Sequence, residues 1–247
     1  MKYIVLTGAS GKFGKVIIKE LLKKGYGVIG ITGREKSRLD LQKDHEGSEC
    51  VFVSCDLTDS LSRESLFEEL MTMKLNIYGL VNNARSISFL KTDSDGLISS
   101  DQFISEFNLG VVAAYDLSMK FSKLETFKRI INISSMYGVV ATNPGLYEDV
   151  SHRPPLHYGV AKAALNHMTK ELATRLVDDG VVVNSISYGG VEGRVNKNFL
   201  ERYSNLCPSR KMLNESEVFK PVEFLLDEGT SSMVGHNLVV DGGWSIW

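Results

Sequence analysis

Tyr158 and Lys162 are the two side chains in this 247-residue sequence best placed for proton exchange. Residues four apart lie on one face of a helix. A tyrosine that exchanges protons near neutral pH needs about 4 kcal/mol of bias toward its phenolate, which corresponds to about three pKa units. An ammonium about 4 Å away supplies roughly that energy at an effective dielectric constant near 20. Lys162 alone is therefore of the right magnitude to activate Tyr158.

A glycine-rich turn between Thr7 and Gly14 forms a second candidate site. Glycines permit positive φ and let backbone N–H groups approach a pyrophosphate, while the following helix N-terminus favours negative charge. Tight strand-to-helix turns also use glycine for steric reasons alone. Because this turn joins an apolar strand to an amphipathic helix, we predict that it binds a dinucleotide. The predicted contacts are Gly8, Ser10, Gly11, Lys12, Phe13 and Gly14.

The end of the next strand bears on which dinucleotide binds. An acidic residue there would bind a free ribose 2′-hydroxyl, but Gly33 occupies that place and Arg34 follows it. The planar guanidinium of Arg34 suits a 2′-phosphate, and Lys12 is a candidate second cation. NADP(H) is therefore favoured, with NAD(H) as the alternative. Both cations are also compatible with ordinary solvated charges.

Short apolar runs alternate with amphipathic stretches along the chain. This pattern predicts an α/β fold with a doubly wound, Rossmann-like parallel sheet of about seven strands, helices on both faces, and a single domain over 1–247. Long loops at 85–100, 139–157 and 189–214 follow strands, and the last two are the expected substrate loops. We expect strands at 3–6, 28–32, 50–54, 77–81, 129–133, 181–187 and 237–240, and helices at 12–24, 60–73, 101–121, 158–177 and 215–226.

The composition argues against several other classes of protein. With 28 basic and 30 acidic residues, the net charge of −2 offers no basic excess for nucleic acid. No apolar run approaches the roughly 20 residues of a membrane helix. The three cysteines and five histidines lack metal-ligand spacing, so we expect no metal site. The simplest expectation is a cytoplasmic protein that acts on a small molecule.

Taken in order, the motifs resemble those of the short-chain dehydrogenase/reductase superfamily, in its shorter single-domain branch. The resemblance covers essentially the whole chain. It is carried by the Thr7–Gly14 turn, Asp56 in Cys55-Asp56-Leu57-Thr58, Asn82-Asn83-Ala84, Asn108 in Phe107-Asn108-Leu109-Gly110, Ser135 in Ser134-Ser135-Met136-Tyr137-Gly138, Tyr158-Gly159-Val160-Ala161-Lys162, and Val239-Val240-Asp241-Gly242-Gly243.

The resemblance implies an NAD(P)-dependent oxidoreductase. The cofactor would exchange a hydride with the substrate carbon while Tyr158 exchanges a proton with its oxygen. Ser135 would hydrogen-bond the substrate oxygen, and Asn108 would help to hold a water that relays protons to Lys162. The resemblance also implies a homo-oligomer, either a dimer or a tetramer. The further cofactor contacts that it implies are Asp56, Leu57, Asn83, Ala84, Tyr158, Lys162, Gly189 and Val191.

Three residues depart from the family pattern. Lys12 stands where the second glycine of the turn is usual, and Tyr188 replaces a proline near the nicotinamide loop. Arg85 replaces the glycine after Asn82-Asn83-Ala84, so its side chain must either leave the cofactor channel or reach into the active site. These departures are compatible with a less active enzyme or an unusual pocket.

The polar loop before Tyr158 suggests a substrate class. Glu148, Asp149, His152 and Arg153 suit a hydroxyl-rich or charged substrate, although a solvated flap would look the same. The loop and the Asp-Gly-Gly-Trp end resemble a subset of the family associated with bacterial surface-carbohydrate and nonulosonic-acid gene clusters. A sugar derivative is therefore the leading expectation.

Two alternatives to a sugar substrate are open. A 3-oxoacyl thioester of acyl carrier protein would need an apolar groove, for which Phe199, Leu200 and Tyr203 are candidates. A cofactor-binding sensor or scaffold without turnover belongs to a different class, and the intact Ser135, Tyr158 and Lys162 argue against it.

Overall fold

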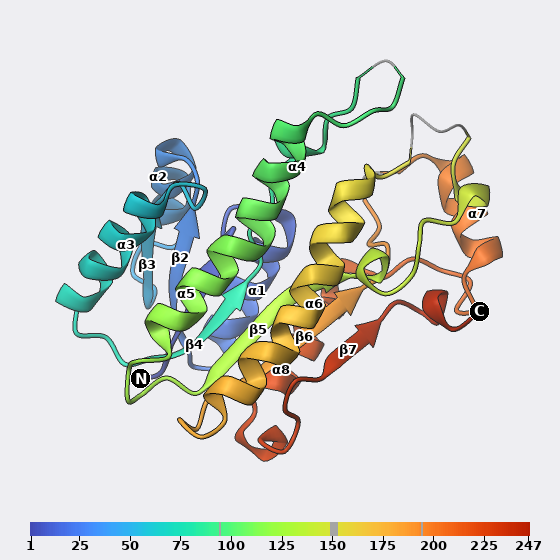
Figure 1. Ribbon diagram of the computed structural model, residues 1–247. Helices are drawn as coiled ribbons and strands as arrows, with labels where there is room; N and C mark the ends of the chain where they lie inside the picture. Colours follow the sequence, from blue (N-terminus) through green and yellow to red (C-terminus); the bar gives the residue numbers. More distant parts are fainter. Residues whose placement is uncertain (94, 149–152, 194) are drawn as a thin grey trace.

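The computed structural model describes residues 1–93, 95–148, 153–193 and 195–247. Within these ranges one seven-stranded parallel sheet has the order β3-β2-β1-β4-β5-β6-β7 (Figure 1). This confirms the predicted doubly wound α/β fold, and the strand order reverses between β1 and β4. The strands are β1 Tyr3–Thr7, β2 Gly27–Thr32, β3 Cys50–Ser54, β4 Ile77–Asn82, β5 Arg129–Ser135, β6 Val182–Tyr188 and β7 Asn237–Val240.

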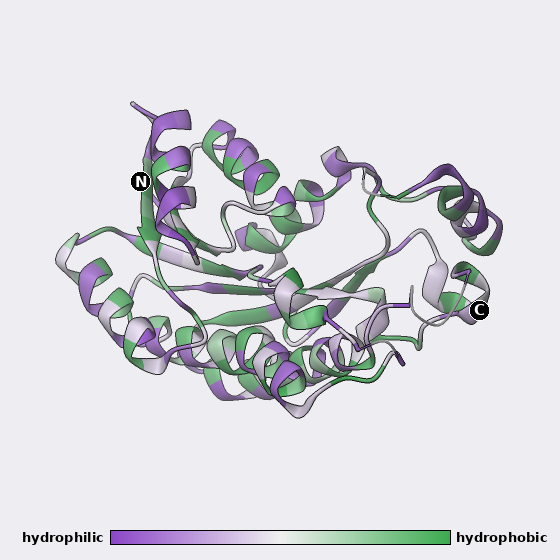
Figure 2. Ribbon diagram, turned by 90° about the horizontal axis from the view of Figure 1, so that it is seen from above, coloured by the Kyte–Doolittle hydropathy of each residue, from purple (hydrophilic) through white to green (hydrophobic). Residues whose placement is uncertain are grey.

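Helices cover both faces of the sheet, as the view from above in Figure 2 shows. Buried side chains of α1 (Lys12–Lys23), α2 (Glu35–Asp44) and α8 (Phe219–Leu226) pack on one face. Those of α3 (Ser60–Thr72), α5 (Ala113–Phe121) and α6 (Leu156–Leu176) pack on the other. The helix α4 (Ser100–Phe107) leads into α5, and α7 (Lys197–Leu206) follows β6. No helix in the described ranges is both long enough and apolar enough to cross a bilayer.

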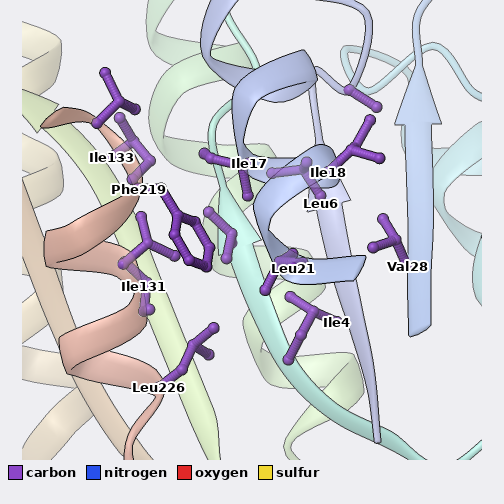
Figure 3. Close-up of a cluster of buried hydrophobic side chains, with 14 of the residues drawn as sticks. Ile4, Leu6, Ile17, Ile18, Leu21, Val28, Ile131, Ile133, Phe219 and Leu226 are labelled. Carbon is purple, nitrogen blue, oxygen red and sulfur yellow. The ribbon is translucent and has the colours of Figure 1, made fainter. Parts of the chain in front are cut away.

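The core on the α1 face shows why the sequence folds in this way. The apolar residues of α1 recur at helical spacing, and Ile17, Ile18 and Leu21 are fully buried in the core that also contains the strands and α8 (Figure 3). Each buried aliphatic side chain contributes about 1.5–3 kcal/mol from burial. The side chains drawn there include Ile4, Leu6, Ile17, Ile18, Leu21, Val28, Ile131, Ile133, Phe219 and Leu226.

The structure differs from the sequence prediction at three helices. The prediction lacked α2, since Leu41 is its only buried residue and leaves no apolar face to detect. It also lacked α7, which lies inside the predicted 189–214 loop, although Asn196 caps it and Phe199, Leu200 and Tyr203 have helical spacing. The predicted 101–121 helix is interrupted by a π-helical turn at Asn108–Val112.

Candidate active site

The carboxyl ends of the strands bring the predicted groups to one edge of the sheet. Ser135 ends β5, the glycine turn follows β1, and Tyr158 and Lys162 lie in the first two turns of α6. The parallel pairing of β1 with β4 and of β4 with β5 places these ends side by side. Ligands of such sheets bind at this edge, near the point where the strand order reverses.

Lys162 is buried beside Tyr158. Its Nζ donates a hydrogen bond to the Ile133 carbonyl at 2.7 Å and lies 5.9 Å from the centroid of the Tyr158 ring. Burial lowers the pKa of Lys162 from 10.5 to about 8; the Glu106 carboxylate opposes this shift and Arg85 adds to it. The ammonium is therefore still charged at neutral pH.

The Ser135 hydroxyl accepts one hydrogen bond from the protein and can still donate one to a ligand. Its Oγ is buried and accepts a hydrogen bond from the Tyr137 N–H at 3.2 Å. The hydroxyl hydrogen is left to donate to another oxygen. The neighbouring Ser134 donates to the Lys162 carbonyl at 3.2 Å, which fixes α6 against β5.

Glu106 is a buried acid that the sequence analysis did not select. It is 2% exposed, and its Oε2 has no hydrogen-bond partner within the described residues. Burial raises the pKa of Glu106, while Lys162, Arg85 and His157 oppose that shift. Glu106 lies four residues before Gly110 of the Phe107-Asn108-Leu109-Gly110 motif, so the two residues share one face of the helix. This spacing was the one sequence signal that Glu106 faces the site.

The side chain of Asn108 is directed toward a neighbouring loop. Its Nδ2 donates to the Thr58 carbonyl at 2.8 Å, and Asn108 begins the π-helical turn. The next two residues, Leu109 and Gly110, line a cavity of about 10 Å³ together with Lys162. A cavity of this size accommodates about one water. The proton-relay role of Asn108 therefore stays a prediction, with room for a water beside Lys162.

The glycine turn is a tightly packed cradle. Gly8 has a φ of +67°, and a Cβ on Gly14 would lie 2.4 Å from the Gly8 carbonyl oxygen. The Thr7 hydroxyl accepts hydrogen bonds from the N–H groups of Asn83 and Ala84, both at 2.9 Å, and the Asn83 amide donates to the Thr7 carbonyl at 3.0 Å. The two predicted cofactor segments are thus one connected unit.

The residues predicted to contact the adenosine half lie at the ends of β2 and β3. Arg34 is exposed and has no ion pair within the described ranges. Asp56 is exposed, and its Oδ1 accepts from the N–H and the hydroxyl of Thr58 at 2.9 and 2.7 Å. Leu57 is buried and lines the cavity beside Lys162.

Lys12 has a different partner from the one that the sequence suggested. Its Nζ forms an ion pair with Glu215 at 2.9 Å and donates to the Glu192 carbonyl. The ammonium therefore bridges α1 to the segment after β6 and is not available as a free cation. Within that segment, the Gly189 N–H donates to the Val240 carbonyl at 2.9 Å, and Val191 forms a parallel bridge with Leu213.

The other two departures from the family pattern have separate roles. Tyr188 is buried, and its hydroxyl donates a hydrogen bond to the Val218 carbonyl. Its ring packs edge-to-face with Phe13. Tyr188 therefore connects α1 to the start of α8 inside the core. Burial raises the pKa of Tyr188. The Arg85 guanidinium carbon lies 4.7 Å from the centroid of the Tyr158 ring. Of the two directions open to Arg85, the structure therefore shows the one toward the active site.

The predicted substrate loops form an aromatic wall. Tyr137 and Tyr147 share a hydrogen bond of 2.6 Å between their hydroxyls, and Tyr147 packs on Phe199 of α7. Arg202 donates to the Leu146 carbonyl at 2.8 Å, and so joins α7 to the loop before α6. Asp149 and His152 lie outside the described residues. Glu148 is exposed and pairs with Arg202 at 3.1 Å, while Arg153 is half-buried.

Comparison with known proteins agrees with this geometry. A family model described as enoyl-(acyl carrier protein) reductase matches residues 8–245. The chain belongs to the short-chain dehydrogenase/reductase superfamily. Post-translational flagellin modification protein A of Campylobacter coli is 30% identical over 99% of this chain and 98% of its own length. A 4-hydroxyisoleucine dehydrogenase in complex with NADH is 25% identical, covers 100% of both chains and superposes with a TM-score of 0.87.

The predicted reaction class is confirmed by these relatives. The 3-oxoacyl-(acyl carrier protein) reductase of Buchnera aphidicola, also a short-chain dehydrogenase/reductase, is 26% identical over 96% of this chain and 95% of its own length. The protein is an NAD(P)-dependent oxidoreductase. Within 1–93, 95–148, 153–193 and 195–247, no group of three or more His, Cys, Asp or Glu side chains is arranged to hold a metal ion.

The residues at the sheet edge fit a nicotinamide dinucleotide. The backbone at Gly8 and Gly14 has no room for side chains, and the turn opens α1, a twelve-residue helix whose N-terminus favours a pyrophosphate. Arg34 and Asp56 are exposed at the neighbouring strand ends. The cofactor, when bound, exchanges a hydride with a substrate carbon.

Proposed function

We propose that this enzyme interconverts a hydroxyl and a carbonyl group on a sugar derivative, with NADP(H) as the preferred cofactor. Ser135, Tyr158 and Lys162 carry the proton chemistry. The observation that supports this assignment is the buried Lys162 ammonium beside the Tyr158 ring, at the edge of the sheet where the glycine turn lies.

Tyr158 exchanges the proton with the substrate oxygen. The Lys162 Nζ lies 5.9 Å from the centroid of the Tyr158 ring, farther away than the contact of about 4 Å that the sequence argument assumed. The Arg85 guanidinium carbon lies 4.7 Å from the same centroid, so a second cation stands beside the ring.

Ser135 and Asn108 assist this exchange. The Ser135 hydroxyl donates to the substrate oxygen as negative charge develops on it, which stabilises the transition state. The small cavity between Gly110 and Lys162 holds one water, through which Lys162 exchanges its proton with solvent. Asn108 positions this water by setting the π-helical turn from which Leu109 and Gly110 line the cavity.

The aromatic wall supports a sugar derivative as the substrate. Faces of aromatic rings carry partial negative charge that attracts the C–H groups of a sugar, and the paired hydroxyls of Tyr137 and Tyr147 offer polar partners. A relative named for post-translational flagellin modification is compatible with this substrate class. The 3-oxoacyl thioester is the second candidate, because a relative is named for that activity.

A substrate panel with a matched tyrosine control tests the proposal. Wild-type enzyme is assayed for turnover of keto-sugars, sugar nucleotides and 3-oxoacyl thioesters by the absorbance of reduced cofactor. We expect sugar substrates to be preferred, and Tyr158→Phe to lower kcat by about 10²–10⁴-fold. Tyr26→Phe, at the opposite edge of the sheet, should leave kcat unchanged. Unchanged turnover in Tyr158→Phe would refute the mechanism, and preference for thioesters would refute the substrate class.

Arg34 is the basis for the NADP(H) preference. Its exposed guanidinium follows β2, where Gly33 takes the place of an acid that would repel a 2′-phosphate. Arg34→Ala should weaken NADPH binding by about tenfold or more and leave NADH binding unchanged, as measured by cofactor fluorescence. Equal effects on the two cofactors would contradict the assignment.

A homo-oligomer, dimer or tetramer, is the assembly that we propose. Exposed apolar side chains lie along the two long helical segments at Ile104, Tyr115 and Val160, and on the C-terminal residues Ile246 and Trp247. Isolated apolar residues are common on surfaces, but α4 and α6 are in contact, so Ile104 and Val160 lie on neighbouring helices. Light scattering at micromolar concentration should give a mass of at least twice 27.4 kDa. A monomer would contradict the proposal.

A further inference from the structure

Arg85 presents an arginine side chain beside the reacting tyrosine. Its guanidinium carbon lies 4.7 Å from the Tyr158 ring centroid, on the loop that follows β4. The residue is exposed, so its side chain is open to solvent. Within the described residues Arg85 forms no salt bridge, and its side chain donates no hydrogen bond to the protein.

We propose that Arg85 binds an anionic group of the substrate, a carboxylate or a phosphate, close to the carbon that reacts at Tyr158. This inference rests on the proposed function and narrows its substrate class from a sugar derivative to an acidic one. It also gives a function to the residue that replaces the family's glycine after Asn83-Ala84.

The charge balance of the site supports an anionic ligand. Two cations, Lys162 and Arg85, lie beside the Tyr158 ring, and Glu106 is the acid that acts on both. While Tyr158 holds its proton, as it does before carbonyl reduction, one carboxylate and two cations leave an excess of one positive charge beside the substrate position. A substrate anion would neutralise that excess, whereas a neutral substrate would leave it in place.

The chemistry of the side chain points the same way. A guanidinium is planar and offers paired N–H donors that match the two oxygens of a carboxylate or phosphate. Contact with the face of the Tyr158 ring restricts the movement of the guanidinium and so reduces the entropy lost on binding. Arg63 and Arg202, by contrast, already have carboxylate partners: Arg63 pairs with Asp116 at 2.7 Å and Arg202 with Glu148 at 3.1 Å.

The distance places the anionic group near the reaction centre. A guanidinium held 4.7 Å from the ring centroid cannot reach a distant part of a large substrate. The acidic group must therefore lie within a few bonds of the carbon that reacts. A sugar acid with a carboxylate next to the reacting carbon fits this requirement, and so does a phosphorylated sugar with the phosphate near that carbon.

Calorimetric titration of the enzyme–NADPH complex tests the inference without a known substrate. Succinate and inorganic phosphate serve as anionic probes, and succinamide is the neutral counterpart of succinate. We expect at least one anion to bind the wild type, and Arg85→Gln to weaken it by about 10- to 100-fold. Succinamide should bind both proteins equally. Arg175→Gln, at the far end of α6, should leave anion binding unchanged. The anion that loses more affinity in Arg85→Gln identifies the group as carboxylate or phosphate.

The outcomes separate this inference from the proposed function. If NADPH binds and neither anion binds the wild type, or if both anions bind Arg85→Gln as tightly as wild type, the role of Arg85 is refuted. An equal loss of anion affinity in Arg175→Gln would also refute it, since that effect would be a general one of net charge. Failure of NADPH to bind would instead refute the proposed function.

Discussion

Replacement of Lys162 by methionine should change the stability of the protein in a pH-dependent way. Burial lowers the pKa of Lys162 from 10.5 to about 8, so the folded protein spends about 3 kcal/mol to keep the ammonium charged at pH 7. Above about pH 8 the folded state releases this proton while the unfolded state retains it up to about pH 10.5. The unfolded state then binds more protons, so the wild-type stability contributed by this residue rises with pH.

The magnitude follows from these two pKa values. Between pH 7 and about pH 9.5 the cost carried by Lys162 falls by about 2 kcal/mol. Methionine has no proton to release, so Lys162→Met lacks this rise. The lost hydrogen bond to the Ile133 carbonyl adds a contribution that is nearly independent of pH. The advantage of the variant over wild type should therefore shrink by about 2 kcal/mol across that range.

Urea unfolding of both proteins at a series of pH values provides the measurement. Lys170→Met is the matched control, because Lys170 is an exposed lysine on the same helix and should give a constant difference from wild type. A free-energy difference between Lys162→Met and wild type that stays constant from pH 7 to about pH 9.5 would show that Lys162 is not desolvated. The account of its pKa given above would then be wrong.

Three further substitutions test separate parts of the structure. Glu106→Gln should move the fall in carbonyl reduction with rising pH from about 8 to a lower value, because the carboxylate opposes the lowering of the Lys162 pKa; a pH–rate profile measures this shift. Gly14→Ala should cost about 1–3 kcal/mol in urea unfolding and weaken NADPH binding, because the new Cβ would lie 2.4 Å from the Gly8 carbonyl oxygen. Tyr188→Phe should cost about 1–3 kcal/mol by removing the hydrogen-bond donor of a buried carbonyl, with an unchanged NADPH Kd.

Two of these substitutions have a matched control on the same chain. Glu68→Gln changes an exposed acid on α3 and should leave the pH profile as it is. Gly33→Ala places a Cβ where no atom lies within 4 Å and should leave stability nearly unchanged. An unshifted profile in Glu106→Gln, full stability in Gly14→Ala, or a weaker NADPH Kd in Tyr188→Phe would each contradict the corresponding argument.

The sequence predicted the sheet because its strands are apolar throughout and bounded by clear turns. The helix α7 was hidden in a predicted loop, because Phe199, Leu200 and Tyr203 were considered as a substrate groove and not as a helical pattern. In the structure Phe199 does face the predicted substrate wall, where it packs on Tyr147, but Tyr203 is buried under Trp244. Periodicity shows that residues share a face, and only the packing shows what the face covers.

The sequence also predicted part of the candidate site: it placed Tyr158 and Lys162 together, but it did not show the partners of the nearby cations. The spacing of Tyr158 and Lys162 was enough to place both on α6, because four residues make one turn. The partners of Lys12 and Arg85 were not readable in this way. Lys12 meets Glu215, which is about two hundred residues away in sequence, and Arg85 meets Tyr158 across the fold. Contacts of this kind depend on the tertiary arrangement and have no local pattern.

The hydrogen bond from Arg202 to the Leu146 carbonyl connects the helix α7 to the loop before α6. The position of each of these stretches therefore depends on the other. Replacing only one of these stretches by the equivalent segment of a relative would remove one partner of this hydrogen bond and leave the other partner without it. Grafts that exchange both stretches together should keep their fold and acquire the donor's selectivity, whereas single grafts should mostly lose order. New specificities in this lineage would then arise by paired changes and not by drift in either stretch alone.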